Sequence, residues 1–185
     1  MEKERDEEIL FALLPDDVVV IRAIGRGTFK NSLGIKQLSG QLIKEGHNPR
    51  FIIDLEKCQT MDSAFMGVLA GVGKNQMKMG LGKTTVVNLN PQTERLLKTL
   101  GLTYILDIRL SDSEKISSAA KEFKSTSLPT LSKFEQTIHM IEAHQALIDI
   151  DESNRVRFQN VMFYLKDSLE REKKKQEGLD TESGE

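Results

Sequence analysis

The chain has 185 residues, enough for one ordinary domain with an appendage or for two small domains. Apolar residues make up 38% of the chain and charged residues 29%, as in a globular protein with well-solvated faces. A net charge of −2 and the absence of tryptophan give no overall attraction to nucleic acid, so the composition argues against a nucleic-acid-binding function.

Cys58 is the single cysteine of the chain, which excludes an internal disulfide and the zinc sites that are built on paired cysteines. The first residues, MEKERDEEILF, lack the basic and apolar regions of a signal peptide. The longest apolar runs, such as Val18–Ile21, are too short to cross a bilayer. We therefore expect a cytoplasmic protein with no membrane span, no metal and no cofactor.

The chain opens with two short apolar runs. Ile9–Leu14 ends in a Pro-Asp-Asp turn sequence, and the β-branched residues Val18–Ile21 follow, so the two runs predict an antiparallel hairpin. After a glycine-containing loop, Asn31 or Ser32 can cap a helix that ends at Gly46.

Alternation of strands and helices continues through the middle of the chain. Phe51–Leu55 is predicted as a buried strand, and Asp62 is expected to cap a helix that runs from Ser63 to about Lys78. Three glycines weaken this helix, which is expected to press close against a sheet. The next predicted elements are a strand at 84–88, a helix at 91–100 that Asn90-Pro91 begins, a strand at 104–108 and a helix at 111–123.

This order predicts an α/β fold with a mixed sheet of about five strands and packed helices, because strand–helix alternation requires parallel neighbours whereas the first hairpin is antiparallel. Beyond the polar segment Lys124–Thr130, apolar residues at helical spacing predict a helical hairpin. The apolar seams of that hairpin must be covered by the first domain, by each other or by a second copy. We therefore expect an α/β domain at 1–125, a helical hairpin extension at 126–175 and a disordered tail at 176–185.

The sequence offers no catalytic constellation, and we expect that the protein is not an enzyme. Gly80–Thr85 is similar to a phosphate-binding P-loop, but a methionine replaces the first glycine and the lysine and threonine open a strand rather than a helix.

His139 and His144 are five residues apart and lack the i, i+4 geometry of a helical zinc pair. Together with His47 they are expected at the surface. Cys58 has no evident base partner and is expected to be buried and structural.

One stretch of the chain carries a family resemblance. A strand that ends in Asp54-Leu55 is followed by Asp62-Ser63-Ala64-Phe65-Met66-Gly67 at a helix start, and a later helix ends in Leu100-Gly101-Leu102. Over about residues 10–123 the chain resembles the STAS domain, the module named for sulphate transporters and anti-sigma factor antagonists. The resemblance implies a mixed sheet with packed helices and a docking surface around the start of the second helix and the neighbouring loops.

The resemblance also implies a phosphorylation switch. In anti-sigma factor antagonists a partner kinase phosphorylates the second Ser/Thr of an Asp-Ser-Ser/Thr-Gly motif, and this abolishes docking. Asp62 and Ser63 match the first two positions, but Ala64 occupies the phosphoacceptor position and Phe65 that of the glycine. The switch is therefore absent or moved. Ser63 is the remaining candidate, either as a phosphorylation site or as a residue that merely helps to begin the helix.

We therefore interpret the chain as a partner-switching regulator of the anti-sigma factor antagonist type, active in bacterial signal transduction and transcription regulation. Its expected partner is an anti-sigma factor or a related serine kinase-like protein. The residues expected to contact the partner are Thr28, Lys30, Asn31, Asp62, Ser63, Ala64 and Met66. The alternative is a structural or scaffold subunit that forms a homodimer through its C-terminal helices. Binding of a nucleotide or another small ligand is the least favoured class.

Overall fold

Residues 7–109, 120, 122–126 and 130–182 are described by the computed structural model, with side chains as far as residue 175. Within these residues the strands are β1 (Glu8–Leu14), β2 (Val18–Gly27), β3 (Arg50–Asp54), β4 (Cys58–Met61), β5 (Thr84–Val87), β6 (Leu106–Arg109) and β7 (Lys124–Ser125). The helices are α1 (Phe29–Lys44), α2 (Ser63–Lys78), α3 (Pro91–Thr99), the 3₁₀ turn η1 (Leu102–Tyr104), α5 (Lys133–Ile150) and α6 (Ser153–Glu182).

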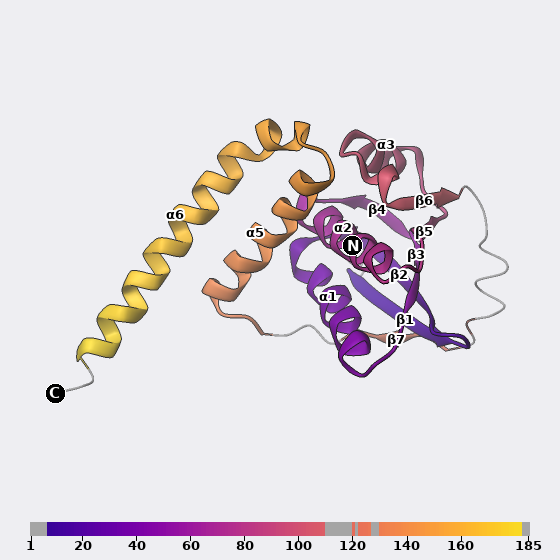
Figure 1. Ribbon diagram of the computed structural model, residues 1–185, viewed down its shortest axis with the longest axis horizontal. Helices are drawn as coiled ribbons and strands as arrows, with labels where there is room; N and C mark the ends of the chain where they lie inside the picture. The colour runs from indigo at the N-terminus through magenta and orange to yellow at the C-terminus, as the bar shows by residue number, and fades with distance from the viewer. Residues whose placement is uncertain (1–6, 110–119, 121, 127–129, 183–185) are drawn as a thin grey trace, which may run out of the picture.

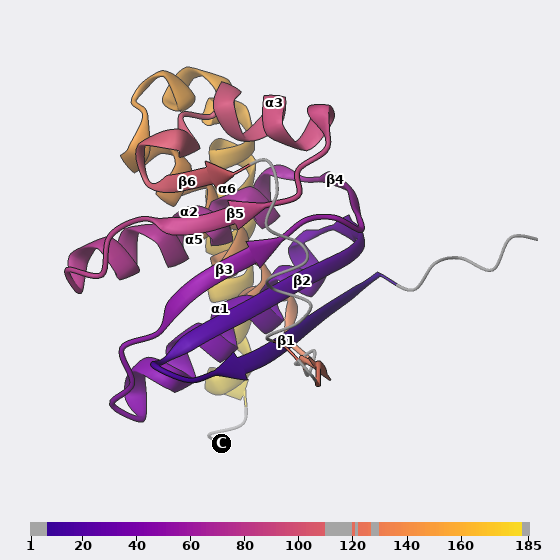
Figure 2. The ribbon, with the colours of Figure 1, turned by 90° about the vertical axis from the view of Figure 1, so that its right-hand side faces the viewer.

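A mixed sheet organises the first part of the chain. Its strands follow the order β6-β5-β3-β2-β1-β7, and β4 pairs with the end of β2 (Figure 2). β2, β3, β5 and β6 are parallel neighbours, whereas β1 is antiparallel to both β2 and β7. The predicted mixed sheet and its antiparallel first hairpin are therefore confirmed. Strands β4 and β7 have no counterpart in the sequence prediction, because both are short and neither shows apolar alternation.

Helices α1 and α2 lie against one face of this sheet (Figure 1). The core between them is built from fully buried side chains of both layers, among them Ile21, Ile35, Ile53, Phe65 and Leu69. Burial of large apolar side chains between a sheet and its helices supplies most of the free energy that stabilises such a domain.

The helix starts follow the predicted caps with one exception. Asp62 caps α2 and Asn90 caps α3, as the sequence predicts. Helix α1 begins at Phe29, earlier than predicted, because the side chain of Asn31 reaches back to accept a hydrogen bond from the Thr28 N–H, 2.8 Å away. The residue that the pattern marks as a cap therefore lies inside the first turn.

The last part of the α/β domain differs from the prediction. The strand expected at 104–108 is replaced by η1 followed by β6, so that its pairing with β5 begins at Leu106. The helix expected at 111–123 lies mainly outside the described residues. Of that segment, Ala120 and Phe123 pack against Val20 and Val87 on the sheet face opposite α1 and α2.

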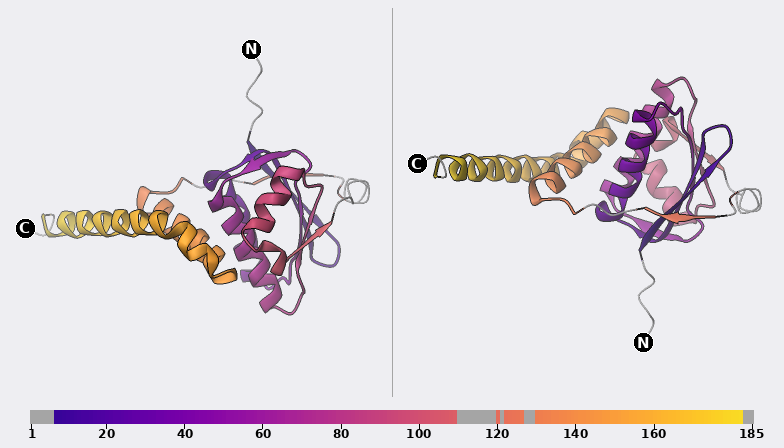
Figure 3. Two further views of the ribbon diagram at one scale, coloured as in Figure 1. Left: turned by 90° about the horizontal axis from the view of Figure 1, so that it is seen from above. Right: turned by 90° about the horizontal axis from the view of Figure 1, so that it is seen from below.

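The predicted helical hairpin is confirmed as α5 and α6. Helix α5 lies on the side of α1 and α2 that faces away from the sheet, and α6 runs on as a long rod away from the domain (Figures 1 and 3). Buried residues of the hairpin, such as Leu147 and Phe158, belong to the same hydrophobic core as the sheet. Helix α6 continues to Glu182, whereas the composition predicts a tail from residue 176.

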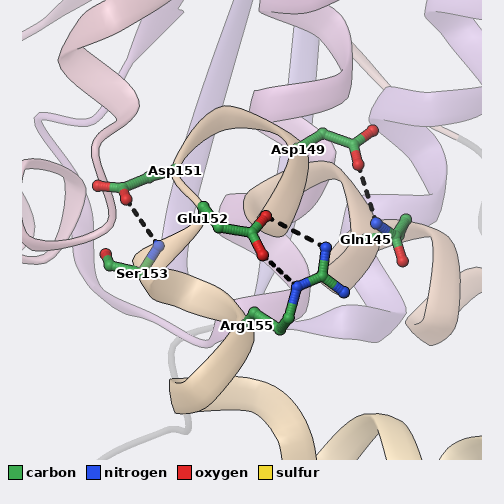
Figure 4. A network of polar contacts seen from close by, with 6 residues as sticks. All are labelled: Gln145, Asp149, Asp151, Glu152, Ser153 and Arg155. Carbon is green, nitrogen blue, oxygen red and sulfur yellow. Dashed lines mark hydrogen bonds and ion pairs between the residues drawn. The ribbon is translucent and has the colours of Figure 1, made fainter.

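A polar network fixes the turn between α5 and α6 (Figure 4). Asp151 accepts a hydrogen bond from the Ser153 N–H at 2.9 Å, and Arg155 forms an ion pair with Glu152. Beneath the turn, the buried amide of Asn154 donates to the carbonyl oxygens of Leu100 and Leu147, at 3.0 and 2.9 Å. The hairpin is thus tied both to itself and to the end of α3.

Candidate functional site

Two predicted segments of the docking surface meet at the carboxylate of Asp62. Its Oδ1 accepts a hydrogen bond from the backbone N–H of Phe65, 2.8 Å away, and its Oδ2 accepts one from the N–H of Phe29, 2.9 Å away. One side chain therefore serves the free N–H groups at the starts of both α1 and α2. Thr28 and Lys30 lie next to these starts in the chain; Thr28 is half-buried and Lys30 is exposed.

Three other predicted contact residues, Asn31, Ala64 and Met66, are buried. The Asn31 side chain is used inside its own loop, where Nδ2 donates to the Arg26 carbonyl oxygen at 2.7 Å and Oδ1 accepts from Thr28. Met66, which we expected to stand exposed, has 4% of its surface accessible because α2 packs between the sheet and α5. In the conformation described, these three residues offer no surface to a partner.

The hydroxyl of Ser63 is bonded to a histidine of α5. Ser63 Oγ lies 2.9 Å from His144 Nε2, and His144 Nδ1 lies 2.7 Å from the carbonyl oxygen of Met140. Because a carbonyl oxygen can only accept, Nδ1 of the neutral ring carries the proton and Nε2 accepts from the Ser63 hydroxyl. The ring also packs edge-on against Phe158 of α6, with 5.0 Å between the ring centroids.

A second serine–histidine pair joins α5 to α1. The Ser32 hydroxyl donates to the Phe29 carbonyl oxygen at 2.9 Å, so its oxygen accepts from His139 Nε2, 3.1 Å away. His139 Nδ1 is then a buried acceptor, and it has no hydrogen-bond partner. Burial lowers the pKa of His139, since the charged ring would lose its hydration there.

The prediction that the histidines lie at the surface is correct for His47 and wrong for His139 and His144, which are 2% and 4% exposed. Both buried rings lie on the side of α5 that packs against the domain, and each is accommodated there by a serine hydroxyl. Their spacing gives a signal that could have identified them. His144 precedes the buried residues Leu147 and Ile148 by one helical turn, so it shares their face.

Helices α2 and α5 approach each other most closely at Gly67. A Cβ atom at this position would lie 2.2 Å from the carbonyl oxygen of Ala143, a distance that no side chain can tolerate. Further along α2, Lys74 donates to Asp149 of α5 at 2.7 Å, and this contact helps to lower the pKa of the Asp149 carboxyl. Ser63, Gly67 and Lys74 recur at helical spacing, so one stripe of α2 faces α5.

Packing between α5 and the domain leaves a cavity of about 260 Å³ among α1, α2 and α5. Its walls include Gly71 and Val72 of α2 and Ala143 and Ala146 of α5.

No group of His, Cys, Asp or Glu side chains in the described part of the chain is arranged to hold a metal ion. Cys58 is buried, as predicted, and burial raises the pKa of its thiol, so it is a poor nucleophile.

Comparisons with known proteins identify the domain. A family model for the STAS domain matches residues 12–115. The solved anti-sigma factor antagonist SpoIIAA, in its unphosphorylated form, is 18% identical over 60% of this chain and 94% of its own, with a TM-score of 0.50. A proposed anti-sigma factor antagonist from Thermotoga maritima is 24% identical, with 59% and 92% of the two chains covered and a TM-score of 0.49.

A third solved structure, an anti-sigma factor antagonist from Mycobacterium paratuberculosis, is 21% identical over 60% of this chain and 93% of its own, with a TM-score of 0.44. The likeness to SpoIIAA supports the fold. Helices α5 and α6 lie outside the residues that the family model matches. Among the residues that the structure describes, no helix is long and apolar enough to span a membrane.

Proposed function

This chain belongs to the STAS domain family, and we propose that it is a non-enzymatic regulator that docks onto a partner protein in the manner of an anti-sigma factor antagonist. The observation that supports this most directly is the double cap at Asp62, which holds the Thr28–Asn31 segment and the start of α2 side by side. Lys30 and Ser63 would then contact the partner from two adjacent helix starts.

The partner of this proposal is an anti-sigma factor or a related serine kinase-like protein in the bacterial cytoplasm, and the outcome of docking is a change in transcription. The structure of SpoIIAA in its unphosphorylated form is that of an anti-sigma factor antagonist. We carry this role over on the strength of the shared domain. The division into a STAS domain at 1–125 and an extension at 126–175 is part of the same proposal, supported by the end of the family match at residue 115.

Ser63 is the phosphorylation candidate of this proposal, since Ala64 has no hydroxyl and is buried. A phosphate on Ser63 would add roughly −1.5 to −2 charge at the N-terminus of α2, where backbone N–H groups and the helix dipole favour an anion. The neighbouring Asp62 carboxylate opposes that charge. Intact mass of the protein from its own host, before and after phosphatase, tests the modification, and an unmodified Ser63 peptide under all growth conditions would retire it.

Docking is tested by titrating the full chain with each purified serine kinase-like anti-sigma factor of the same host in a calorimeter. We expect Lys30→Glu to weaken binding by at least tenfold, because it reverses a charge at the proposed surface. Lys44→Glu is the matched control, an exposed lysine at the other end of the same helix, and should leave binding unchanged. Equal affinities for the two variants, or no binding by the unmodified chain, would contradict the proposal.

A scaffold role through self-association is the second candidate function. It is supported by Val156, Phe163 and Tyr164, which are exposed on α6 and share one helical face at spacings of seven and eight residues. Light scattering of the full chain over a range of concentrations separates the two candidates. A stable dimer that Phe163→Glu converts to a monomer would favour the scaffold, and a monomer throughout would favour transient docking.

A further inference from the structure

Helix α5 covers part of the surface to which the proposed function assigns the partner. It meets the start of α2 at Ser63, crosses α2 at Gly67 and meets the start of α1 at Ser32. The family match ends before α5 begins, so this helix is an addition to the matched domain. A partner that docks at the start of α2 therefore has to compete with a segment of the chain itself.

The contact between α5 and the domain is less complete than the core of the sheet. Among the described residues, the buried side-chain atoms without a hydrogen-bond partner are His139 Nδ1 and Asn154 Oδ1, and both belong to the α5–α6 hairpin. The pocket among α1, α2 and α5 opens to solvent beside the same contact, so α5 does not fill the space between the two helices. An unpaired buried acceptor weakens an interface relative to a fully bonded core.

Exposed ion pairs stand at the edges of this contact. Lys36 of α1 pairs with Glu142, and Lys74 of α2 pairs with Asp149, with the side chains on both sides between about a third and a half exposed. Ion pairs of this kind contribute little to stability, because water solvates the separated charges almost as well. Breaking these ion pairs at the edge of the contact would therefore cost little free energy. The buried part of the contact is what holds α5 to the domain.

We propose that α5 is an intramolecular competitor for the docking surface, and that the structure shows the closed form of a two-state protein. In the closed form Ser63 is bonded to α5. In the open form α5 leaves, while the sheet with α1 and α2 stays folded, and the α2 stripe of Ser63, Gly67 and Lys74 becomes available to a partner or a kinase. That opening exposes a docking surface rests on the proposed function, but the release of α5 from the domain can be measured without a partner.

The test uses a thiol at residue 63 in the full chain. Ser63→Cys places a thiol at the half-buried position that His144 of α5 contacts, and the native Cys58, which is buried in β4, reports global unfolding in the same molecule. Both thiols are labelled with a maleimide that carries a polyethylene glycol chain, and their rates are read separately by mass spectrometry of peptides. Labelling of residue 63 without labelling of Cys58 is the signature of local opening.

Two glycines of α2 supply a matched pair of variants in this background. Gly67→Ala introduces a Cβ against the Ala143 carbonyl and should open α5, which raises the labelling rate at residue 63 at least tenfold while Cys58 stays protected. Gly71→Ala is the control, since a Cβ there meets no described atom within 4 Å outside its own helix. It should leave the labelling rate at residue 63 unchanged, and Cys58 should be labelled no faster than in the parent.

A second pair covers the case in which Gly67→Ala fails to fold. His144→Ala removes the contacts of α5 with residue 63 and with Phe158 and should also speed labelling of residue 63 alone, whereas His47→Ala, at an exposed loop, should not. Labelling of both thiols together in each opening variant would overturn the proposal, because α5 would then unfold with the domain. Equal rates at residue 63 in all variants would also overturn it. Either result leaves the calorimetric test of docking unaffected, so the two proposals can fail separately.

Discussion

The Ser63 hydroxyl donates a hydrogen bond to His144 Nε2, 2.9 Å away, so the serine beside the family's phosphoacceptor position also fastens α5 to the domain. The bond is directional, because His144 Nδ1 is committed to the Met140 carbonyl oxygen. A phosphate on Ser63 would replace the donor on which this bond depends. Modification of Ser63 and the position of α5 are therefore coupled.

The Ser63–His144 bond should be measurable as a coupling energy. Ser63→Ala leaves a buried Nε2 without a donor and should cost about 1–2 kcal/mol in the free energy of unfolding. His144→Phe keeps the ring contact with Phe158 but removes the acceptor. In a double-mutant cycle by urea unfolding, we expect a coupling of about 1 kcal/mol. Additive effects of the two substitutions would show that the bond does not form in solution.

Asp62 should be more important for stability than an ordinary helix cap, because its carboxylate accepts from the N–H groups of both Phe29 and Phe65. We expect Asp62→Ala to lower the free energy of unfolding by about 2–3 kcal/mol, where a single cap contributes about 1. Asp62→Asn keeps one acceptor oxygen and should lose about half as much. Glu45→Ala, an exposed acidic residue at the end of α1, is the control and should stay within about 0.5 kcal/mol of the parent.

His139 should make stability depend on pH. Its pKa in the folded protein is lowered from the ordinary value of 6.5 by burial and by Lys36, against smaller opposing effects of Glu142 and Asp62. Well above pH 6.5 the ring is neutral in both states and contributes no pH dependence. As the pH falls below 6.5 the unfolded chain takes up a proton that the folded protein resists, so stability is lost by up to about 1.4 kcal/mol per pH unit.

Urea unfolding of the parent and of His139→Gln between pH 7.5 and 5 isolates this contribution from that of the other titrating groups. The difference in unfolding free energy between the two proteins should change with pH below 6.5 and stay constant above it. A difference that is independent of pH over the whole range would contradict the burial of a neutral His139.

Gly67 and Gly71 of α2 should respond to alanine with opposite signs. Gly71→Ala should stabilise the protein by about 0.5–1 kcal/mol, because alanine favours the helix and the added methyl group meets open space. Gly67→Ala gains the same helix propensity but forces α5 from the Ala143 contact, and we expect a net loss of about 1–3 kcal/mol. Chemical denaturation of both variants checks the prediction, and equal shifts would show that α5 does not approach α2 as described.

Local signals in the sequence were sufficient for most of the α/β domain. The cap at Asp62, the extent of α2, the cap at Asn90 and the first hairpin all depend on residues that are close in sequence, and all are confirmed. Strand β7 could not be found in this way. It is defined by the pairing of Phe11 with Lys124, a contact between residues far apart in the chain.

The cover that α5 places over α2 could also have been predicted, because α2 carries the information. Residues Ala64–Gly73 are apolar around the whole circumference of the helix, and a helix of this kind is buried on every side. We interpreted Met66 as a partner contact because it lies off the predicted buried stripe, at the edge where the family resemblance implies docking. The face of α2 that points away from the sheet also has to be covered. Helix α5, with its buried histidines, provides part of that cover. Only tertiary structure shows that α5, rather than a partner, lies there.

The covalent link between the sheet and α5 affects how a partner can displace that helix. Thr126 is held at the sheet edge, where its N–H donates to the Ile9 carbonyl oxygen at 2.9 Å, and α5 begins soon afterwards, after the cap Ser132. A released α5 thus stays tethered near its binding site, at an effective concentration of millimolar order. A free helix of equal intrinsic affinity at about 1 μM would lose to the tethered α5 by roughly a thousandfold. An effective partner therefore has to bind far more tightly than α5 does, or bind after a modification has already weakened the contact between α5 and the domain.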